Sequence, residues 1–305
     1  MNTVTFPGLG LTFRLNPVAF TIFGYEIYWY GVIIAAGFVL AVIFCMSQSE
    51  KFGLTSDTVL DMLIFTVPSA IIGARLYYIV FNLDYFRKAD GSLDFAQMPR
   101  IHDGGLAIYG GIIFAVIACF LVMRYKKIPF FAMADLGAFG LLIGQLVGRW
   151  GNFVNVEAYG GETGLPWRMG ITQWVGGSPG NLEVHPTFLY ESLWNLAGFC
   201  LLVFLMKKGL RKFDGMLFFT YIAWYGFGRG LIEGLRTDSL YLFSTGIRVS
   251  QLLGFLTCLA AVIVIVYRLR KGCPPEKLYV NQIQEREEPE HGGDDTGRQG
   301  PGGQV

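Results

Sequence analysis

Three arginines occur in or beside long apolar runs of this sequence. Arg149 lies in VGRWGNFVNVEAYG, and Arg229 and Arg236 lie in AWYGFGRGLIEGLRTD. A charged residue within a bilayer costs about 2.5–3.5 kcal/mol on insertion scales, so such residues usually have a function. Guanidinium groups bind phosphate through paired hydrogen bonds and keep their charge when partly desolvated. The three arginines therefore predict a site for an anionic head group such as a lipid phosphate.

Helical spacing brings the polar residues of the second stretch onto one face. At about 100° per residue, four polar residues fall within about 80° of one another: Tyr225, Arg229, Glu233 and Arg236. An alternative without ligand binding is an ion pair between Arg229 and Glu233 that only joins helices. Several arginines at one depth favour a site over such an isolated pair.

The composition is that of a polytopic membrane protein. The 305 residues are 53% hydrophobic and 15% charged, with a mean hydropathy of +0.45, whereas a soluble domain carries about 25% charged residues. Nothing in this composition supports nucleic-acid binding. Apolar windows of about 20 residues predict seven spans, near residues 22–44, 59–82, 105–123, 132–150, 187–206, 214–235 and 247–267.

Short basic clusters set the expected orientation. RYKK at 124–127, KKGLRK at 207–212 and RLRK at 268–271 fall on one side of a seven-span chain. Cytoplasmic loops carry an excess of lysine and arginine, so this side is predicted to be the cytoplasm. The predicted fold class is an all-α polytopic membrane protein with seven transmembrane helices, its N-terminus outside and its C-terminus cytoplasmic.

Three segments are expected along the chain. Residues 1–21 form an outer N-terminal segment, and residues 22–268 form the seven-span domain with a long outer loop at 151–186. Loops of that length usually have a function. Residues 269–305 form a cytoplasmic tail that is expected to be disordered, because its charged, glycine-rich composition buries too little apolar area.

No cofactor or metal site is expected. The five cysteines include no CxxC pair and none lies in a predicted outer segment, which argues against disulfides and zinc. GFGRG is not expected to bind a dinucleotide, because no strand precedes it. Two glycine repeats instead predict close helix packing: Gly140, Gly144 and Gly148, and Gly226, Gly230 and Gly234.

Further polar residues share the predicted depth of the arginines, near the outer ends of the spans. The inner halves of the spans are nearly free of charge by comparison. We therefore expect one site in the outer leaflet, built from six spans. The additional residues are Tyr30 in YWYG, Arg75 in IIGARLYY, Tyr109 in GGLAIYGG, Asn152, and Glu191 in HPTFLYES.

Four long motifs resemble those of the bacterial phosphatidylglycerol:prolipoprotein diacylglyceryl transferase family. GRWGNFVNVEAYG, GGLAIYGG, HPTFLYES and YGFGRGLIEGLRTD carry the resemblance, which covers about residues 25–268. It implies transfer of the diacylglyceryl group from phosphatidylglycerol to the lipobox cysteine thiol of a preprolipoprotein, giving a thioether and releasing glycerol phosphate. It also implies a multi-pass protein of the bacterial plasma (inner) membrane whose partners are these substrates and membrane lipids.

The resemblance gives roles to individual residues. The family's phosphatidylglycerol-binding arginine corresponds to Arg149. Cations at this place would stabilise the departing phosphate and lower the pKa of a thiol from about 8.5. The residues expected to act in catalysis are Arg149, Arg229, Tyr109, Tyr225 and Glu233. Those expected to bind substrate are Arg149, Asn152, Asn155, Glu157, Arg236, Tyr30, His185 and Glu191.

The sequence offers no obvious general base. Many family members have histidine in the G-G-x-x-x-H-G-G motif where this chain has Tyr109. A phenol with a pKa near 10 is a poor base at neutral pH, so Tyr109 is expected to hydrogen-bond the lipid or the thiol. His185 is expected to support or orient the site rather than to act as the base, and His102 to be an exposed loop residue.

Two other functions stay open. A non-catalytic phospholipid or solute transporter would have polar groups at mid-membrane on broken helices and an internal repeat, and neither is evident. A phospholipid-dependent transferase with another acceptor, such as a sugar or an amine, would use the same head-group chemistry. Only the resemblance separates such a transferase from one that acts on the lipobox thiol.

Overall fold

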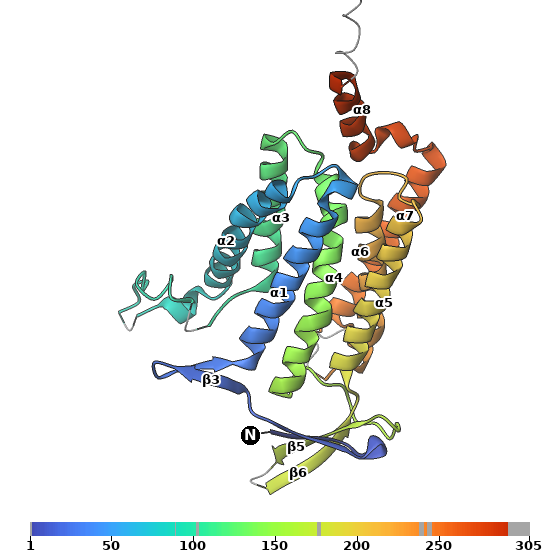
Figure 1. Cartoon of the computed structure of the whole chain (residues 1–305). Helices are drawn as coiled ribbons and strands as arrows, with labels where there is room; N and C mark the ends of the chain where they lie inside the picture. Colours follow the sequence, from blue (N-terminus) through green and yellow to red (C-terminus); the bar gives the residue numbers. More distant parts are fainter. Residues whose placement is uncertain are drawn as a thin grey trace, which may run out of the picture.

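Seven helices in the described residues form a bundle, and small sheets lie at one of its ends (Figure 1). The computed structural model describes residues 2–88, 90–101, 104–175, 178–237, 241–242 and 246–291. The helices of the bundle are α1 (Trp29–Gln48), α2 (Ser56–Phe81), α3 (Ile108–Tyr125), α4 (Phe130–Asn155), α5 (Thr187–Lys207), α6 (Met216–Ile232) and α7 (Val249–Lys271).

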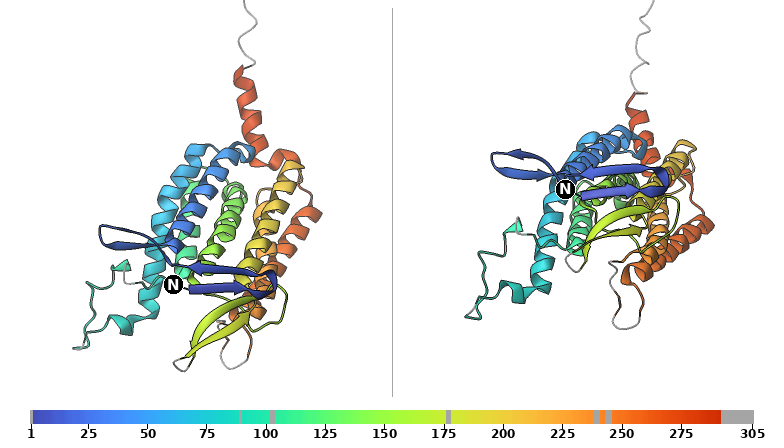
Figure 2. Two further views of the ribbon diagram at one scale, coloured as in Figure 1. Left: turned by 60° about the horizontal axis from the view of Figure 1, so that its bottom comes forward. Right: turned by 90° about the horizontal axis from the view of Figure 1, so that it is seen from below.

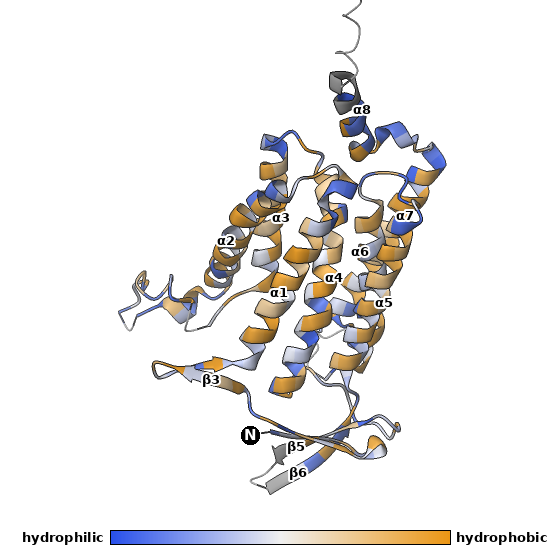
Figure 3. Ribbon diagram, in the orientation of Figure 1, coloured by the Kyte–Doolittle hydropathy of each residue, from blue (hydrophilic) through white to orange (hydrophobic). Residues whose placement is uncertain are grey.

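The bundle has the length and the surface of a membrane-spanning domain. Helices α1 to α5 and α7 are long and apolar enough to cross a membrane. Helix α6 has 17 residues, and a 3₁₀ turn (Glu233–Leu235) continues it. Apolar residues cover most of the helices, and hydrophilic residues gather near their ends and beyond (Figure 3). The chain is therefore a mostly helical, multi-pass membrane protein.

The two ends of the bundle differ in charge and in structure. The basic clusters 124–127, 207–212 and 268–271 lie at one end, which we call the basic end. The opposite end, which we call the sheet end, carries all of the strands (Figures 1 and 2). The chain passes back and forth between the two ends from α1 to α7.

A four-stranded antiparallel sheet covers the sheet end. Its strand order is β2-β1-β5-β6. Because β1 pairs with β5, with Val4 opposite Ile171, the N-terminal segment and the long loop before α5 form one layer. The all-α prediction lacked this sheet. Its strands are β1 (Asn2–Phe6), β2 (Leu11–Leu15), β5 (Met169–Val175) and β6 (Ser178–Val184).

The sheet has an apolar core of its own against the ends of α4 and α5. The rings of Phe153 on α4 and Phe188 on α5 stack with their centroids 4.7 Å apart. Burial of these aromatic rings removes a large apolar area from water and fixes the two helix ends beside each other. The buried residues of this core are Val4, Phe6, Phe153, Met169, Ile171, Val184 and Phe188.

Glycines let α6 approach α7 closely. A Cβ on Gly226 would lie 2.5 Å from the carbonyl oxygen of Gly254, and a Cβ on Gly230 would lie 2.6 Å from the ring of Phe255. Any larger residue at these two positions would force the helices apart. The predicted glycine packing is thus confirmed in α6. In α4, a Cβ on Gly140 or Gly148 would lie 3.2 Å from a side chain of α1, whereas Gly144 has open space beside it.

Buried charge also occurs at the basic end, and the expectation of nearly uncharged inner halves is wrong there. Asp135 on α4 is 0% exposed. It accepts hydrogen bonds from Arg211 Nε at 2.8 Å and from the backbone N–H groups of Gly215 and Phe218. Arg211 also pairs with Asp214 at 2.5 Å. This network holds the α5–α6 connection against α4.

The beginning of the expected disordered tail is helical. A 3₁₀ turn (Pro275–Lys277) and helix α8 (Tyr279–His291) follow α7. The backbone N–H of Tyr279 donates to Asp214 Oδ2 at 3.1 Å, which ties this segment to the basic end. Residues 292–305, the remainder of that tail, lie outside the described residues.

Candidate functional site

A buried carboxylate gathers three arginines near the sheet end of the bundle. Glu191 on α5 is 4% exposed. Its Oε2 lies 2.5 Å from Arg149 Nη2 on α4. Its Oε1 lies 3.1 Å from Arg229 Nη1 on α6 and 3.2 Å from Arg236 Nη1 just beyond α6. The structure thus brings together the three arginines that the sequence singled out, and we call them, with Glu191 and Glu233, the arginine cluster.

Glu233 holds Arg229 from a second direction. Its side chain is 2% exposed, and its Oε2 lies 2.7 Å from Arg229 Nη2. Arg248 donates through Nη1 to the backbone carbonyl of Glu233. The ion pair suggested by helical spacing is therefore present as one part of a larger network. Three guanidinium groups therefore lie against the side chains of Glu191 and Glu233.

Tryptophans fix the helices that carry the cluster. Trp150 Nε1, next to Arg149, donates to Ser192 Oγ at 3.2 Å, and Ser192 Oγ donates to the carbonyl of Leu146 at 3.0 Å. Trp194 and Trp224 stack at 4.4 Å, and each indole N–H donates to the carbonyl of the other residue. These contacts lock α4 to α5 and α5 to α6, which keeps the arginines in register.

Polar side chains extend the cluster along the end of α4. Arg149 Nη1 donates to Asn152 Oδ1 at 3.3 Å, and Asn152 Nδ2 donates to Glu157 Oε1 at 2.8 Å. Val156, at φ +55°, ends the helix in the left-handed region and turns the chain back. Asn155 is half-buried in the last turn, and in the described part of the chain it makes no hydrogen bond to the arginines. Asn152 and Glu157 therefore link the arginine cluster to the exposed surface beyond the end of α4.

Tyr225 lies beside the cluster. It lines a cavity of about 10 Å³ between α5 and α6, which is room for a single water molecule. Asn195, 2% exposed, lines the same cavity, and its Oδ1 has no hydrogen-bond partner among the described residues. The complete lining is Glu191, Trp194, Asn195, Tyr225, Gly228, Arg229 and Ile232.

Tyr30 contacts the same region from α1. A Cβ on Gly151 would lie 2.7 Å from Tyr30 Cδ2, so the ring rests directly on the backbone of α4. Gly151 is two residues beyond Arg149. The first turn of α1 is in this way coupled to the helix end that presents the arginine.

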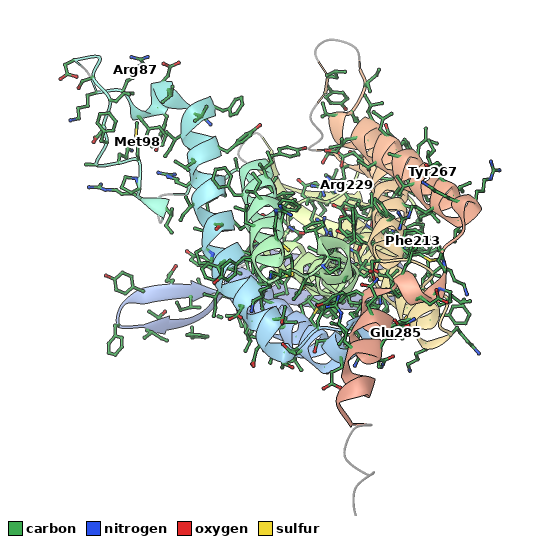
Figure 4. All side chains as sticks on the ribbon, turned by 90° about the horizontal axis from the view of Figure 1, so that it is seen from above. Arg87, Met98, Phe213, Arg229, Tyr267 and Glu285 are labelled. Carbon is green, nitrogen blue, oxygen red and sulfur yellow. The ribbon has the colours of Figure 1, made fainter. Side chains whose placement is uncertain are left out.

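Arg75 is not part of the arginine cluster. It is 7% exposed and donates to four backbone carbonyls of the loop after α2, those of Gln97, Met98, Gly104 and Gly105. Seen along the bundle, Arg229 lies among the helices, whereas Arg87 and Met98 lie on the loop that projects from α2 (Figure 4). Arg75 thus holds a loop in place. The prediction that Arg75 joins the other polar residues in one site, made from its place near the outer end of its span, is wrong.

Tyr109 also lies apart from the cluster. It is 46% exposed at the beginning of α3. Helix α3 packs on α2, where a Cβ on Gly110 would lie 2.3 Å from Gly73 O. Across the residues described, Tyr109 forms neither a hydrogen bond nor an ion pair with the three arginines or with Glu191.

His185 supports the chain before α5. Its Nδ1 lies 3.2 Å from Tyr190 Oη, which also accepts a hydrogen bond from Trp167 Nε1 at 2.8 Å. Its backbone N–H donates to Gly161, and its carbonyl accepts from Gly160. These contacts fit the expected supporting role. His102 lies outside the described residues.

Sequence reasoning missed two residues of this region. Arg248 directly precedes α7 at the outer end of the predicted seventh span, and Asn195 is an isolated amide inside α5. The sequence signal for Asn195 was its place four residues after Glu191, on the same helical face. The sequence signal for Arg248 was its place at the outer end of a span, the depth that the other arginines share.

The arginine cluster has the chemistry of an anion site. Each guanidinium has five N–H donors, and Arg149 uses Nη2 for Glu191 and Nη1 for Asn152. Its side chain is 20% exposed, and those of Arg229 and Arg236 are 18% and 10% exposed. N–H groups of Arg149 and Arg229 beyond those bonded to Glu191, Glu233 and Asn152 can bind a further anion, and an apolar surrounding strengthens their attraction to it.

Comparison with known proteins finds one family. Residues 17–267 match the family model described as prolipoprotein diacylglyceryl transferase. The matched range begins at residue 17, before the two strands that precede α1, and includes nearly all of α7. The whole bundle, with every residue of the arginine cluster, is therefore part of the match.

Three relatives carry the name phosphatidylglycerol–prolipoprotein diacylglyceryl transferase. The relative from Finegoldia magna is 42% identical over 250 residues, which cover 82% of this chain and 94% of the relative. The relative from Clostridioides difficile is 38% identical over 258 residues, covering 85% and 97% of the two chains. A third, from Listeria monocytogenes, is 40% identical over 269 residues, covering 86% and 92%. The similarity thus extends over nearly the full length of these proteins.

Proposed function

Because the chain belongs to the prolipoprotein diacylglyceryl transferase family, we propose that its arginine cluster binds the phosphate of phosphatidylglycerol. The protein transfers the diacylglyceryl group from phosphatidylglycerol to the lipobox cysteine of a prolipoprotein. One observation carries the assignment of the site. Three arginines from separate segments meet on Glu191 inside an otherwise apolar bundle.

The chemistry of the transfer requires positive charge at this place. The thiolate sulfur attacks the glyceryl carbon that bears the phosphate, and the carbon–oxygen bond breaks. Its electron pair leaves with glycerol phosphate, and the thiol proton is released. The phosphate diester carries one negative charge and the departing monoester gains a second. Guanidinium groups already oriented by Glu191 and Glu233 stabilise that developing charge.

The same cluster favours the nucleophile. Guanidinium groups beside a thiol lower its pKa, so that more thiolate is present at neutral pH. We assign Arg149 and Arg229 to the phosphate, and Arg236 and Asn152 to its surroundings. Tyr225 lines the small cavity beside Arg229, and we assign its hydroxyl as a hydrogen-bond donor to the lipid or the thiol.

The remaining predicted residues act around the cluster. Tyr30 and His185 position the ends of α4 and α5, and Glu157 holds Asn152. Asn155, at the end of the same helix, is assigned to ester or glycerol oxygens. Tyr109, at the beginning of α3, is assigned to the lipid rather than to proton transfer.

We place the basic end in the cytoplasm and the sheet end outside. The positive-inside rule supports this orientation, because the basic clusters are short and lie at the C-terminal ends of α3, α5 and α7. With α6 counted as a seventh span, an odd number of crossings puts the two ends of the chain on opposite sides. The arginine cluster then faces the outer leaflet of the bacterial plasma (inner) membrane.

A transfer assay tests the proposal directly. The purified protein is incubated with phosphatidylglycerol labelled in its acyl chains and with a lipobox peptide, and a peptide with Cys→Ser is the control. A thioether-linked lipid on the cysteine peptide only is expected. Binding without product would favour a transporter, and label on another acceptor would favour a different transferase.

A further inference from the structure

A second, isolated hairpin precedes α1. It consists of β3 (Val18–Ile22) and β4 (Tyr25–Tyr28). The hairpin forms its own two-stranded sheet, separate from the four-stranded sheet. It projects sideways from the bundle at the sheet end in every view (Figures 1 and 2). A two-stranded hairpin is at best marginally stable in water without a further layer to pack on.

The two faces of the hairpin differ sharply in polarity. Residues directly opposite in an antiparallel pair share a face, and successive residues alternate between faces. The pairs Ile22 with Tyr25 and Phe20 with Ile27 lie on one face, and the pair Thr21 with Glu26 lies on the other. One face, the apolar face, therefore carries Phe20, Ile22, Tyr25 and Ile27. The other, the polar face, carries Thr21, Glu26 and the ring of Tyr28.

Among the described residues, protein leaves the apolar face largely uncovered. Phe20 and Ile22 are each 48% exposed, and Tyr25 is 78% exposed. These large side chains stand together on one small surface, which marks it as a site of contact.

The tip of the hairpin exposes another aromatic ring at a conformational cost. Phe23 is 98% exposed and has φ +49°, next to Gly24 at φ +85°. A tight turn with two positive φ values favours asparagine followed by glycine, and a bulky residue in the first position is strained. A strained and fully exposed phenylalanine indicates that contact of its ring with something outside the protein offsets the strain.

Charge on the hairpin is confined to the polar face. Between residues 17 and 28 the sequence contains one ionisable acid, Glu26, and no lysine or arginine. Tyr28 Oη donates to Glu26 Oε2 at 2.9 Å, which satisfies part of this carboxylate. The opposite face can therefore leave water without desolvating a charge.

The hairpin is tied to the beginning of a membrane-spanning helix. The N–H of Trp29, the first residue of α1, donates to the carbonyl of Pro17 at 2.8 Å. The hairpin thus starts where α1 leaves the bilayer, at the depth where tyrosine and tryptophan concentrate in membrane proteins.

We propose that the hairpin inserts its apolar face and Phe23 into the lipid interface at the sheet end, and that lipid is the layer that completes it. The polar face with Glu26 then points to water. Because Pro17 joins the hairpin to α1 and Tyr30 rests on α4 at Gly151, this anchor also sets the depth of the arginine cluster relative to the head groups. The proposal depends only on the chain spanning a membrane.

Quenching by brominated lipid tests the proposal with neighbouring residues as controls. Single-cysteine variants Ile22→Cys and Thr21→Cys are made in a background whose five native cysteines are replaced, labelled with the fluorophore NBD, and placed in nanodiscs. The lipid is phosphatidylcholine with or without bromine on its acyl chains. The pair Tyr25→Cys and Glu26→Cys repeats the comparison on the other strand, so that one misfolded variant does not decide the result.

The two faces are expected to differ in lipid contact. The label at position 22 or 25 should be quenched at least about twofold more strongly by brominated lipid than the label at 21 or 26. Equal quenching on both faces would overturn the proposal. So would labels at 22 and 25 that are shielded from both brominated lipid and aqueous iodide, because that result would show a protein partner on the apolar face.

Discussion

Replacing Arg149 by lysine should lower kcat/KM for diacylglyceryl transfer by about 10–150-fold. Arg149 reaches Glu191 through Nη2 at 2.5 Å and Asn152 through Nη1 at 3.3 Å. A lysine ammonium keeps the charge but lacks the planar fork, so it cannot hold both partners and face a phosphate. Loss of one charge-assisted hydrogen bond costs about 1.5–3 kcal/mol, and each 1.4 kcal/mol is about tenfold in rate.

The assay measures initial rates with labelled phosphatidylglycerol and a lipobox peptide at equal protein concentration. Arg168→Lys is the matched control, because Arg168 pairs with Glu183 at 2.5 Å on the sheet, outside the arginine cluster. That variant should keep wild-type rates. Wild-type kcat/KM for Arg149→Lys, with an unchanged melting temperature, would refute the reasoning, and an equal loss in Arg168→Lys would show that the effect is not specific to the cluster.

Three further predictions concern Glu191, Tyr109 and the orientation. Glu191→Gln removes a buried charge shared by three partly buried arginines, so the free energy of unfolding should fall by about 3–5 kcal/mol, and an unchanged melting temperature in detergent would contradict the proposed network. Tyr109→Phe should slow transfer without moving the thiol-linked limb of the pH–rate profile by more than about one unit, and a shift of several units would make Tyr109 the base. In a cysteine-free background, a membrane-impermeant maleimide should label Asn181→Cys in intact cells lacking an outer membrane, and Lys208→Cys only after permeabilisation, whereas the reverse pattern would invert the topology.

The helices of the bundle, and the places of the polar residues along them, could be predicted from the sequence. Each span is a local apolar run, and the position of Arg149 or Arg229 along its run gives the helix end near which it lies. Helical spacing also gives the face that Tyr225, Arg229 and Glu233 share. These properties depend only on neighbouring residues, which a single sequence contains.

Lateral position could not be predicted in the same way. Arg75 and Arg149 each lie six residues before the end of their helix, yet Arg75 binds loop carbonyls beside α2 while Arg149 meets Glu191. Which helix lies beside which is set by side-chain packing between distant segments. The central role of Glu191 follows from that packing, because its three partners lie on two other helices and the segment after α6.

The sheet at the end of the bundle was missed for a related reason. Val4 pairs with Ile171 across most of the length of the chain. The strands are short and surrounded by glycines, so local pattern gives little signal. The buried network around Asp135 had a visible sign, an aspartate within an apolar run, but its partner Arg211 lies among exposed basic residues.

Direct binding of phosphatidylglycerol tests the central claim most simply. Titration calorimetry with a short-chain phosphatidylglycerol in detergent gives Kd for the wild-type protein, for Arg229→Lys and for the control Arg168→Lys. The proposed site predicts a Kd at least about tenfold higher for Arg229→Lys, equivalent to about 1.4 kcal/mol, and an unchanged Kd for Arg168→Lys. Equal affinity in all three proteins would place the lipid phosphate elsewhere and contradict the assignment of the arginine cluster.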